Sequence, residues 1–298
     1  VYCANFEPIN AKVWCLNASD GTFIWNYTCV SNILGSPVVL EGKLYIADYG
    51  GRVYCLNATK ECEYANRLIW NNTQTILTMI MNTPAIADGR IYLGTYAQAP
   101  NPNKVFCLNS STGEYIWNFT ALSTIWNILV VDGKVYAGQS SVGGIGRVYC
   151  LDAVTGAYLW NFTTGSTVRS PFSVHGDNLF FGSYDNNTYC INKNTGVKVW
   201  NYTTGGAIYQ SVPAISGDGK VIIGTGGLTA PVGDGCLYCL NESIGALIWK
   251  YQTWPLGTFG IFGGPSIADG KVFIASTNKK IYALYPPSSP RSPYALFK

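Results

Sequence analysis

The chain has 298 residues, of which 48% are hydrophobic and only 12% charged, about half of the charged fraction usual for soluble domains. Its net charge of +3 comes without a run of Lys or Arg, which argues against a nucleic-acid-binding patch. No apolar segment reaches the roughly 18 residues of a membrane-spanning helix, so we expect no membrane span. The length suffices for one large all-β domain or two ordinary domains. The chain begins at Val1 and shows no signal peptide, which indicates a processed or trimmed polypeptide.

In chain order, the first residues read as three short strands at 1–6, 12–17 and 22–27. Each later unit reads as four strands: a small-residue strand such as SPVVL, a Tyr-rich strand such as KLYIADY, a strand such as RVYCLNA, and a strand that carries Trp. Residues 292–298 supply the expected last strand of the final unit. The predicted units cover residues 1–27 (partial), 36–72, 82–119, 124–162, 169–202, 209–251 and 261–298.

Two recurring signals set the period of these units. Tryptophans end the repeated phrase at intervals of 40 to 49 residues, at Trp25, Trp70, Trp117, Trp160, Trp200 and Trp249. Before five of the second strands stands an acidic residue with glycine, as in Asp88-Gly89, which is typical of a two-residue hairpin turn. No segment shows a sustained helical period. The sequence therefore predicts an all-β protein.

The segment GRVYCLDAVTGAYLW, residues 146–160, resembles the blade signature of the PQQ-like (pyrroloquinoline-quinone-type) β-propeller repeat, with Cys150 where the family usually has Ala. The resemblance covers almost the whole chain. It implies a single propeller, most likely of seven four-stranded antiparallel blades, in which the six tryptophans above dock each blade on the next. A six-blade closure is disfavoured, because residues 12–17 and 279–284 would then compete for one place. The family hosts dehydrogenases, scaffolds and surface proteins, so the resemblance alone implies no activity.

The first predicted blade lacks its innermost strand. Unpaired backbone groups at a sheet edge are costly when buried and promote association when exposed. Residues upstream of Val1 are the favoured explanation, and truncation would also account for the gap. A strand donated by another copy or another surface protein is the alternative, which makes a homo-oligomer a predicted partner state.

Ten Asn-x-Ser/Thr sequons occur, which is more than chance placement would give. Four of them, Asn17, Asn57, Asn109 and Asn241, fall where the repeat needs Asx for a turn. Five others follow the repeated Trp directly, with Thr two residues on: Asn26, Asn71, Asn118, Asn161 and Asn201. The tenth is Asn186. The repeated pair of Asn and Thr predicts N-linked glycans on the outer rim and an extracellular protein at the cell surface. Duplication of an ancestral repeat is the competing explanation.

Six of the ten cysteines hold one repeated place, which predicts buried thiols: Cys15, Cys55, Cys107, Cys150, Cys190 and Cys239. Of the other four, Cys29 and Cys62 are the predicted disulfide, which would link the first two blades. Cys236 and Cys239 form C-x-x-C, but on a strand their side chains point to opposite faces, so we expect neither a metal site nor a redox pair there.

The sequence predicts no catalytic, cofactor-binding or metal-binding residue. The one histidine, His175, stands in a predicted turn and cannot alone form a multi-His metal site. Quinoprotein dehydrogenases carry adjacent cysteines, a Trp floor and a calcium-binding Glu/Asn/Asp set. This chain has no adjacent cysteines, and the calcium set cannot be matched, so a quinone-dependent oxidoreductase is disfavoured.

Low charge, sequons and the incomplete blade favour a non-enzymatic, glycosylated structural or adhesive subunit of a surface layer, sheath or filament. The second hypothesis is a protein-binding assembly scaffold, similar to the propeller lipoprotein of outer-membrane assembly. It would bind through the loops at 95–104 and 226–235. A quinone or sugar oxidoreductase is the third.

Overall fold

The computed structural model describes the chain except residues 6, 8–9, 61–62, 64–65, 73–77, 98–100, 227–233, 254–259, 286–293 and 297–298. Its named elements are all β-strands, and they form seven antiparallel sheets within these described residues. This confirms the predicted all-β propeller of seven blades with an incomplete first blade. The chain divides into two compact units, residues 1–139 with 149–159 and residues 140–148 with 160–298. No described segment forms a helix long and apolar enough to span a bilayer.

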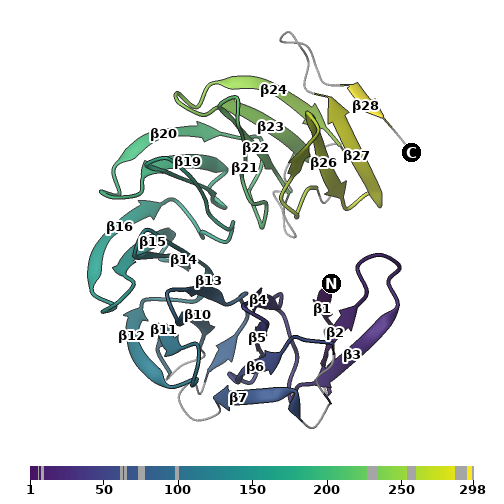
Figure 1. Cartoon of the computed structure of the whole chain (residues 1–298). Helices are drawn as coiled ribbons and strands as arrows, with labels where there is room; N and C mark the ends of the chain where they lie inside the picture. The colour runs from purple at the N-terminus through teal and green to yellow at the C-terminus, as the bar shows by residue number, and fades with distance from the viewer. Residues whose placement is uncertain are drawn as a thin grey trace. The chain divides into compact units, whose positions relative to one another are not determined.

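Three sheets lie in the first unit (Figure 1). The first consists of β1 (Tyr2–Ala4), β2 (Lys12–Leu16) and β3 (Phe23–Thr28). The second consists of β4 (Val38–Leu40), β5 (Lys43–Ala47), β6 (Val53–Asn57) and β7 (Leu68–Asn72). The third consists of β12 (Tyr115–Ala121), β11 (Asn103–Asn109) and β10 (Arg90–Tyr96), with β9 (Ala85–Ala87) and β8 (Met79–Ile80) both paired to β10.

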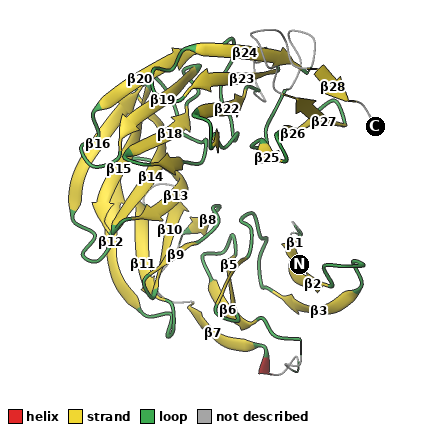
Figure 2. Ribbon diagram, turned by 45° about the horizontal axis from the view of Figure 1, so that its top comes forward, coloured by secondary structure: helices red, strands yellow, loops and turns green. Residues whose placement is uncertain are grey.

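The fourth sheet contributes residues to both units and consists of β13 (Ile125–Val131), β14 (Lys134–Val142), β15 (Ile145–Asp152) and β16 (Tyr158–Thr164). Three further sheets lie in the second unit (Figure 2). The first of these consists of β17 (Ser173–His175), β18 (Asn178–Gly182), β19 (Asn187–Asn192) and β20 (Lys198–Thr203). The second consists of β21 (Ala214–Ser216), β22 (Lys220–Gly224), β23 (Cys236–Asn241) and β24 (Leu247–Gln252). The third consists of β25 (Ser266–Ala268), β26 (Lys271–Ser276), β27 (Lys280–Tyr285) and β28 (Tyr294–Leu296).

The predicted hairpin turns have the backbone that their sequence requires. Asp88 and Gly89 both have positive φ, 49° and 70°, and the turns at Glu41, Asp132 and Asp269 repeat this pair of angles. Two consecutive positive φ angles match the right-handed twist of the flanking strands. The turn at Asp218-Gly219 has a different backbone conformation, because only the glycine has positive φ (77°).

A β-bulge precedes the repeated tryptophan. Cys107 pairs with Trp117 while the next residue, Leu108, pairs with Tyr115, so Ile116 is the extra residue on β12. The same register shift occurs in β3, β7, β20 and β24. A bulge bends its strand and re-aims side chains. We therefore attribute the shared orientation of these indoles to the bulge. The strands β3, β7, β12, β16, β20 and β24 are named the Trp strands below.

Aromatic contacts repeat from sheet to sheet within each unit, which explains an aromatic content of 14%. The residue two places after Trp lies against the tyrosine of the next sheet's third strand, as in Phe119–Tyr149, whose ring centroids are 5.1 Å apart. Tyr202–Tyr238 repeats this contact at 5.9 Å in the second unit. Such pairs add about 0.5–1.5 kcal/mol each beyond the burial of their area. The core thus lies between neighbouring sheets.

Candidate functional site

Four of the six tryptophans make the same contact with the following sheet. Each indole lies between two sheets, and its N–H donates to a main-chain carbonyl of the turn that precedes the next Trp strand. The pairs are Trp70 Nε1 with Ser110 O (3.1 Å), Trp117 Nε1 with Ala153 O (3.2 Å), Trp160 Nε1 with Asn194 O (3.0 Å) and Trp200 Nε1 with Glu242 O (2.8 Å). These indole–turn contacts join successive blades within each unit.

The turn that receives the indole has one fixed geometry. In the turn 109–114, Asn109 N donates to Glu114 O (2.8 Å), Gly113 N donates to Asn109 O (2.8 Å), and Asn109 Oδ1 accepts from Ser111 N (2.8 Å). Gly113 has φ +74°, and a Cβ added there would lie 2.5 Å from the Trp70 ring. Only glycine suits both the backbone and the close indole. The turns that begin at Asp152, Asn192 and Asn241 repeat this arrangement.

Sequons of the turn class use their side-chain oxygen inside this turn. Asn17, Asn57, Asn109 and Asn241 each accept a backbone N–H from two residues later through Oδ1. Asp152, which has no sequon, does the same for Val154, and its pKa is lowered mainly by the backbone hydrogen bond from Thr155. These asparagines therefore have a structural role that needs no sugar.

Sequons of the strand class lie directly after the repeated tryptophan on the Trp strands. Asn71, Asn161 and Asn201 are exposed, while Asn26 and Asn118 are half-buried. Asn118 Nδ2 donates to Tyr115 Oη (2.7 Å), and Asn201 Nδ2 donates to Asn187 Oδ1 (3.1 Å). Each Trp strand ends the pairing order of its sheet, so these residues stand on sheet edges. Three of the five side chains are thus exposed at a sheet edge.

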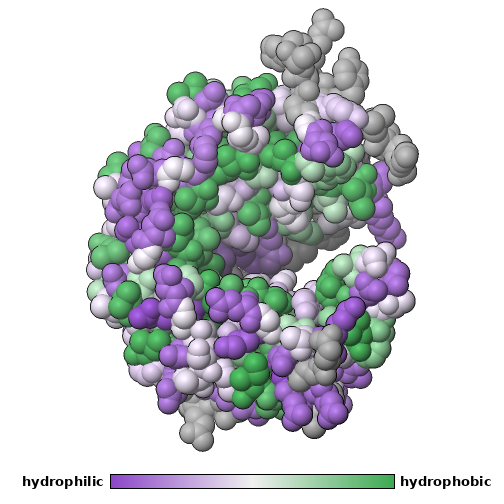
Figure 3. All heavy atoms as spheres, in the orientation of Figure 1, coloured by the Kyte–Doolittle hydropathy of each residue, from purple (hydrophilic) through white to green (hydrophobic). Residues whose placement is uncertain are grey.

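The same edges also expose apolar side chains. The residue before each Trp is Ile69, Leu159 or Val199 in three blades, and these side chains are 45%, 44% and 48% exposed. Figure 3 shows apolar and polar side chains interspersed over the face in view. An edge strand with exposed apolar residues favours pairing with another chain unless something covers it. The tenth sequon, Asn186, is separate: it lies in the turn before β19 with φ 66°.

The structure also contains a repeated contact between an aspartate and a tyrosine that the sequence did not reveal. In the fifth blade, Asp185 Oδ2 accepts from Tyr189 Oη (2.7 Å) and from Gly165 N (2.7 Å). Gly165 directly follows β16, the Trp strand of the preceding blade. Asp48 with Tyr54, and Asp234 with Tyr238, repeat the acid–tyrosine pair. Burial raises the pKa of all three tyrosines. These carboxylates stabilise the blade interface.

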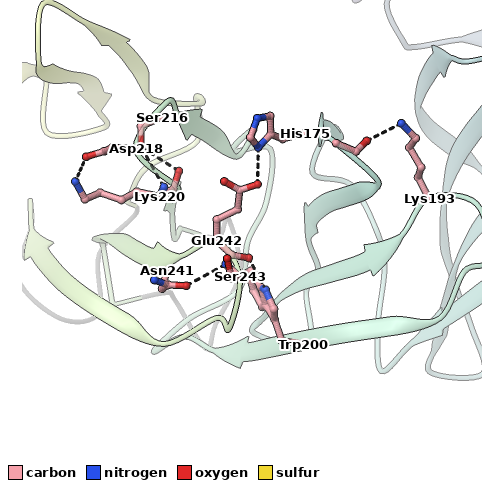
Figure 4. A network of polar contacts seen from close by, with 10 residues as sticks. His175, Lys193, Trp200, Ser216, Asp218, Lys220, Asn241, Glu242 and Ser243 are labelled. Carbon is pink, nitrogen blue, oxygen red and sulfur yellow. Dashed lines mark hydrogen bonds and ion pairs between the residues drawn. The ribbon is translucent and has the colours of Figure 1, made fainter.

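His175 lies at the end of β17, where a turn was predicted, and points to the next blade. Its Nδ1 is 2.6 Å from Glu242 Oε1, and the carbonyl of the same Glu242 accepts from Trp200 (Figure 4). The His175 side chain is 60% exposed, and no nucleophilic Ser or Cys is hydrogen-bonded to it among the contacts described. The pair therefore braces two blades.

The cysteines fall into buried and exposed classes. The six repeated thiols are buried, and burial raises the pKa of Cys107, Cys150, Cys190 and Cys239 to about 12. Cys236 is buried as well, and Cys3 is exposed. Cys29 is a buried free thiol in the structure. Its predicted partner, Cys62, lies outside the described residues, so the disulfide stays a prediction.

A metal-assisted quinone site would need metal-ligating side chains that lie close together. No three His, Cys, Asp or Glu side chains in this part of the chain lie close enough together to hold a metal ion. A pocket of about 400 Å³ next to β8 and β10 is lined by Tyr49, Thr78, Met79, Tyr96 and Asn101, without an acid or base. Of the two predicted binding loops, residues 98–100 and 227–233 are outside the described residues.

Comparisons with known proteins agree with this architecture. A family model described as outer membrane protein assembly factor BamB matches residues 7–61 and 131–291. The crystal structure of BamB from Moraxella catarrhalis superposes with a TM-score of 0.71 at 16% identity, covering 99% of this chain and 87% of that one. A europium-containing methanol dehydrogenase gives a TM-score of 0.70 at 12% identity, covering 95% and 80%. Identities this low show the fold alone.

A curated relative is also matched over part of its length. Tetrathionate hydrolase of Acidithiobacillus ferrooxidans is 26% identical over 108 residues, which are 36% of this chain and 20% of the relative. The chain thus spans about a fifth of the length of that curated relative.

Proposed function

We propose that this chain, which belongs to the PQQ-type propeller family described as outer membrane protein assembly factor BamB, is a non-enzymatic, N-glycosylated structural subunit of a cell-surface layer, sheath or filament. The carrying observation is the recurrence of Asn and Thr on sheet edges directly after the docking tryptophan. Five of the six Trp strands have this pair, while Lys250 holds the equivalent place in the sixth. A polar side chain alone would satisfy that position.

Glycans at these positions would cover exposed edge strands. The Trp strands are sheet edges with exposed apolar side chains, which favour uncontrolled strand pairing. A bulky, solubilising sugar on Asn161 or Asn201 would cover the edge beside Leu159 or Val199. Assembly would then be limited to surfaces that carry no glycan. An extracellular location is part of this proposal, because N-linked glycans are typical of exported proteins.

The intact mass of the protein from its native source tests this proposal. We expect a mass well above the 32.4 kDa polypeptide and a return to that value after chemical deglycosylation. Asn161→Gln should remove one glycan's mass. The matched control is Lys250→Gln, because Lys250 holds the equivalent place after the tryptophan of the sixth Trp strand and has no sequon. A native mass equal to the bare polypeptide would end the proposal.

An assembly scaffold is the second candidate, and the match to a family described as an assembly factor favours it. On this hypothesis the propeller binds other proteins rather than its own copies. Cross-linking in native membranes or envelopes separates the two cases: a scaffold yields a stoichiometric complex with different chains, whereas a structural subunit yields ladders of one chain.

A further inference from the structure

Tyr115 is an exposed aromatic residue that lies beside a candidate glycan site. It stands on β12, the Trp strand of the third blade, and it is 46% exposed. Its hydroxyl accepts a hydrogen bond from Asn118 Nδ2, with 2.7 Å between the two atoms. Asn118 begins the sequon that ends at Thr120, which is exposed. An exposed aromatic side chain therefore contacts the amide nitrogen that would carry an N-linked sugar.

The β-bulge at Ile116 brings these two side chains together. Residues three apart on a regular strand point to opposite faces of the sheet. Asn118 pairs with Phe106 on β11. Tyr115 pairs with Leu108, which lies two residues after Phe106 and therefore on the same face. The extra residue at the bulge thus places Tyr115 on the face that carries the asparagine of the sequon.

The place three residues before the asparagine is aromatic in three of the five sequons of the strand class. Phe23, Tyr115 and Tyr158 stand before Asn26, Asn118 and Asn161, whereas Leu68 and Lys198 stand before Asn71 and Asn201. In β20 the same register shift sets Lys198 on the face that carries Asn201. The fifth blade therefore has the bulge and the sequon without the aromatic ring.

A sugar on Asn118 suits this aromatic neighbour chemically. Attachment through the anomeric carbon replaces one of the two hydrogens on Nδ2, and the remaining hydrogen can still be donated to Tyr115 Oη. One face of a pyranose carries C–H groups, whose small positive charge is attracted to the negative face of an aromatic ring. At Asn201 the acceptor of the Nδ2 hydrogen is instead the amide oxygen of Asn187. Of these two sites, the third blade is the one that offers a ring.

We propose that the first sugar of a glycan on Asn118 packs on the ring of Tyr115, which makes Tyr115 a carbohydrate-binding residue of β12. The ligand is a pyranose that is linked to the same chain. The contact covers an exposed aromatic side chain on an edge strand. This inference rests on the proposed glycosylation, and it adds that a glycan on Asn118 stabilises the fold, whereas a glycan on Asn201 only covers an edge.

A thermodynamic cycle on the full chain tests the contact. The chain is made in an expression host that attaches N-linked glycans, and an endoglycosidase trims each glycan to one N-acetylglucosamine. Thr120→Ala removes the sequon and hence the sugar, while the side chains of Asn118 and Tyr115 stay in place. Its effect on the unfolding equilibrium constant, measured in urea, should be about three- to tenfold larger in the wild type than in the Tyr115→Ala background. Tyr115→Phe should keep the whole effect, because the ring remains.

The fifth blade provides the matched control. Thr203→Ala removes the sequon of Asn201, and Lys198→Ala changes the place equivalent to Tyr115. The effects of these two substitutions should be independent to within about twofold. The first cycle, repeated on chain from a host that attaches no glycan, should also show independent effects, because no sugar is then present.

Peptide mass mapping shows whether Asn118 carries the sugar, and circular dichroism shows that each variant is folded. Equal effects of Thr120→Ala in both backgrounds would overturn the contact. Coupling that persists without glycans would do the same, as would a wild-type chain that carries sugars elsewhere but none on Asn118. The proposed function is decided separately by the mass of the native protein. A glycosylated native protein without this coupling would therefore refute the contact alone.

Discussion

Replacing Gly156 by Ala should destabilise the first unit more than the same change at Gly133. Both glycines have positive φ, +73° and +68°, so each alanine costs about 1–2 kcal/mol of backbone strain. At Gly133 the new Cβ meets nothing within 4 Å, whereas at Gly156 it would lie 2.6 Å from two carbons of the Trp117 ring. Moving the indole adds about 1–3 kcal/mol of overpacking. The expected losses are about 2–5 kcal/mol for Gly156→Ala and about 1–2 kcal/mol for the control.

Urea unfolding followed by far-UV circular dichroism measures the difference. The two variants should differ in midpoint with little change in slope, because the folded surface is the same. Indole fluorescence in the folded state should change only for Gly156→Ala, since Trp117 lies against that turn. Equal midpoints would refute the claim that the indole–turn contact is a tightly packed joint.

Four further results are expected. Asp185→Ala should cost about 1–3 kcal/mol, because the hydroxyl of the buried Tyr189 loses its acceptor, while Asp177→Ala on the exposed turn should cost less than about 0.5 kcal/mol; equal losses would count against the acid–tyrosine contact. Iodoacetamide at pH 8 should modify Cys3 in the folded protein and leave Cys107 intact, which peptide mass mapping would show. Burial raises the pKa of Cys107 to about 12, so the folded state favours the protonated thiol. The stability that this thiol contributes is complete below about pH 9 and is lost as pH rises toward 12. The free energy of unfolding should therefore fall over that range, and a rise would contradict the direction of the pKa shift. His175→Gln should change stability by no more than about 1 kcal/mol, since its side chain is mostly exposed.

The sequence predicted the fold because its decisive features are local and repeated. The hairpin turn at Asp88-Gly89 needs only two neighbouring residues, and the turn 109–114 needs an Asx and a glycine at fixed spacing. Neither depends on a distant contact. The same locality makes the Asx turn at Asn109 predictable from the sequence.

Features that depend on space between sheets could not be predicted. Asp185 and Asp234 each accept a hydrogen bond from the tyrosine four residues later. In the second blade the equivalent acid, Asp48, stands six residues before its tyrosine, Tyr54. Spacing alone therefore hides the contact. Arg67 is 2% exposed and covers the Trp25 indole, but it stands outside the repeated pattern, so no local signal marks it.

Electron microscopy of native material tests the central claim most directly. We predict extended assemblies of one repeating propeller, with extra density on Asn161 and Asn201. Isolated particles with bare edge strands would contradict the account.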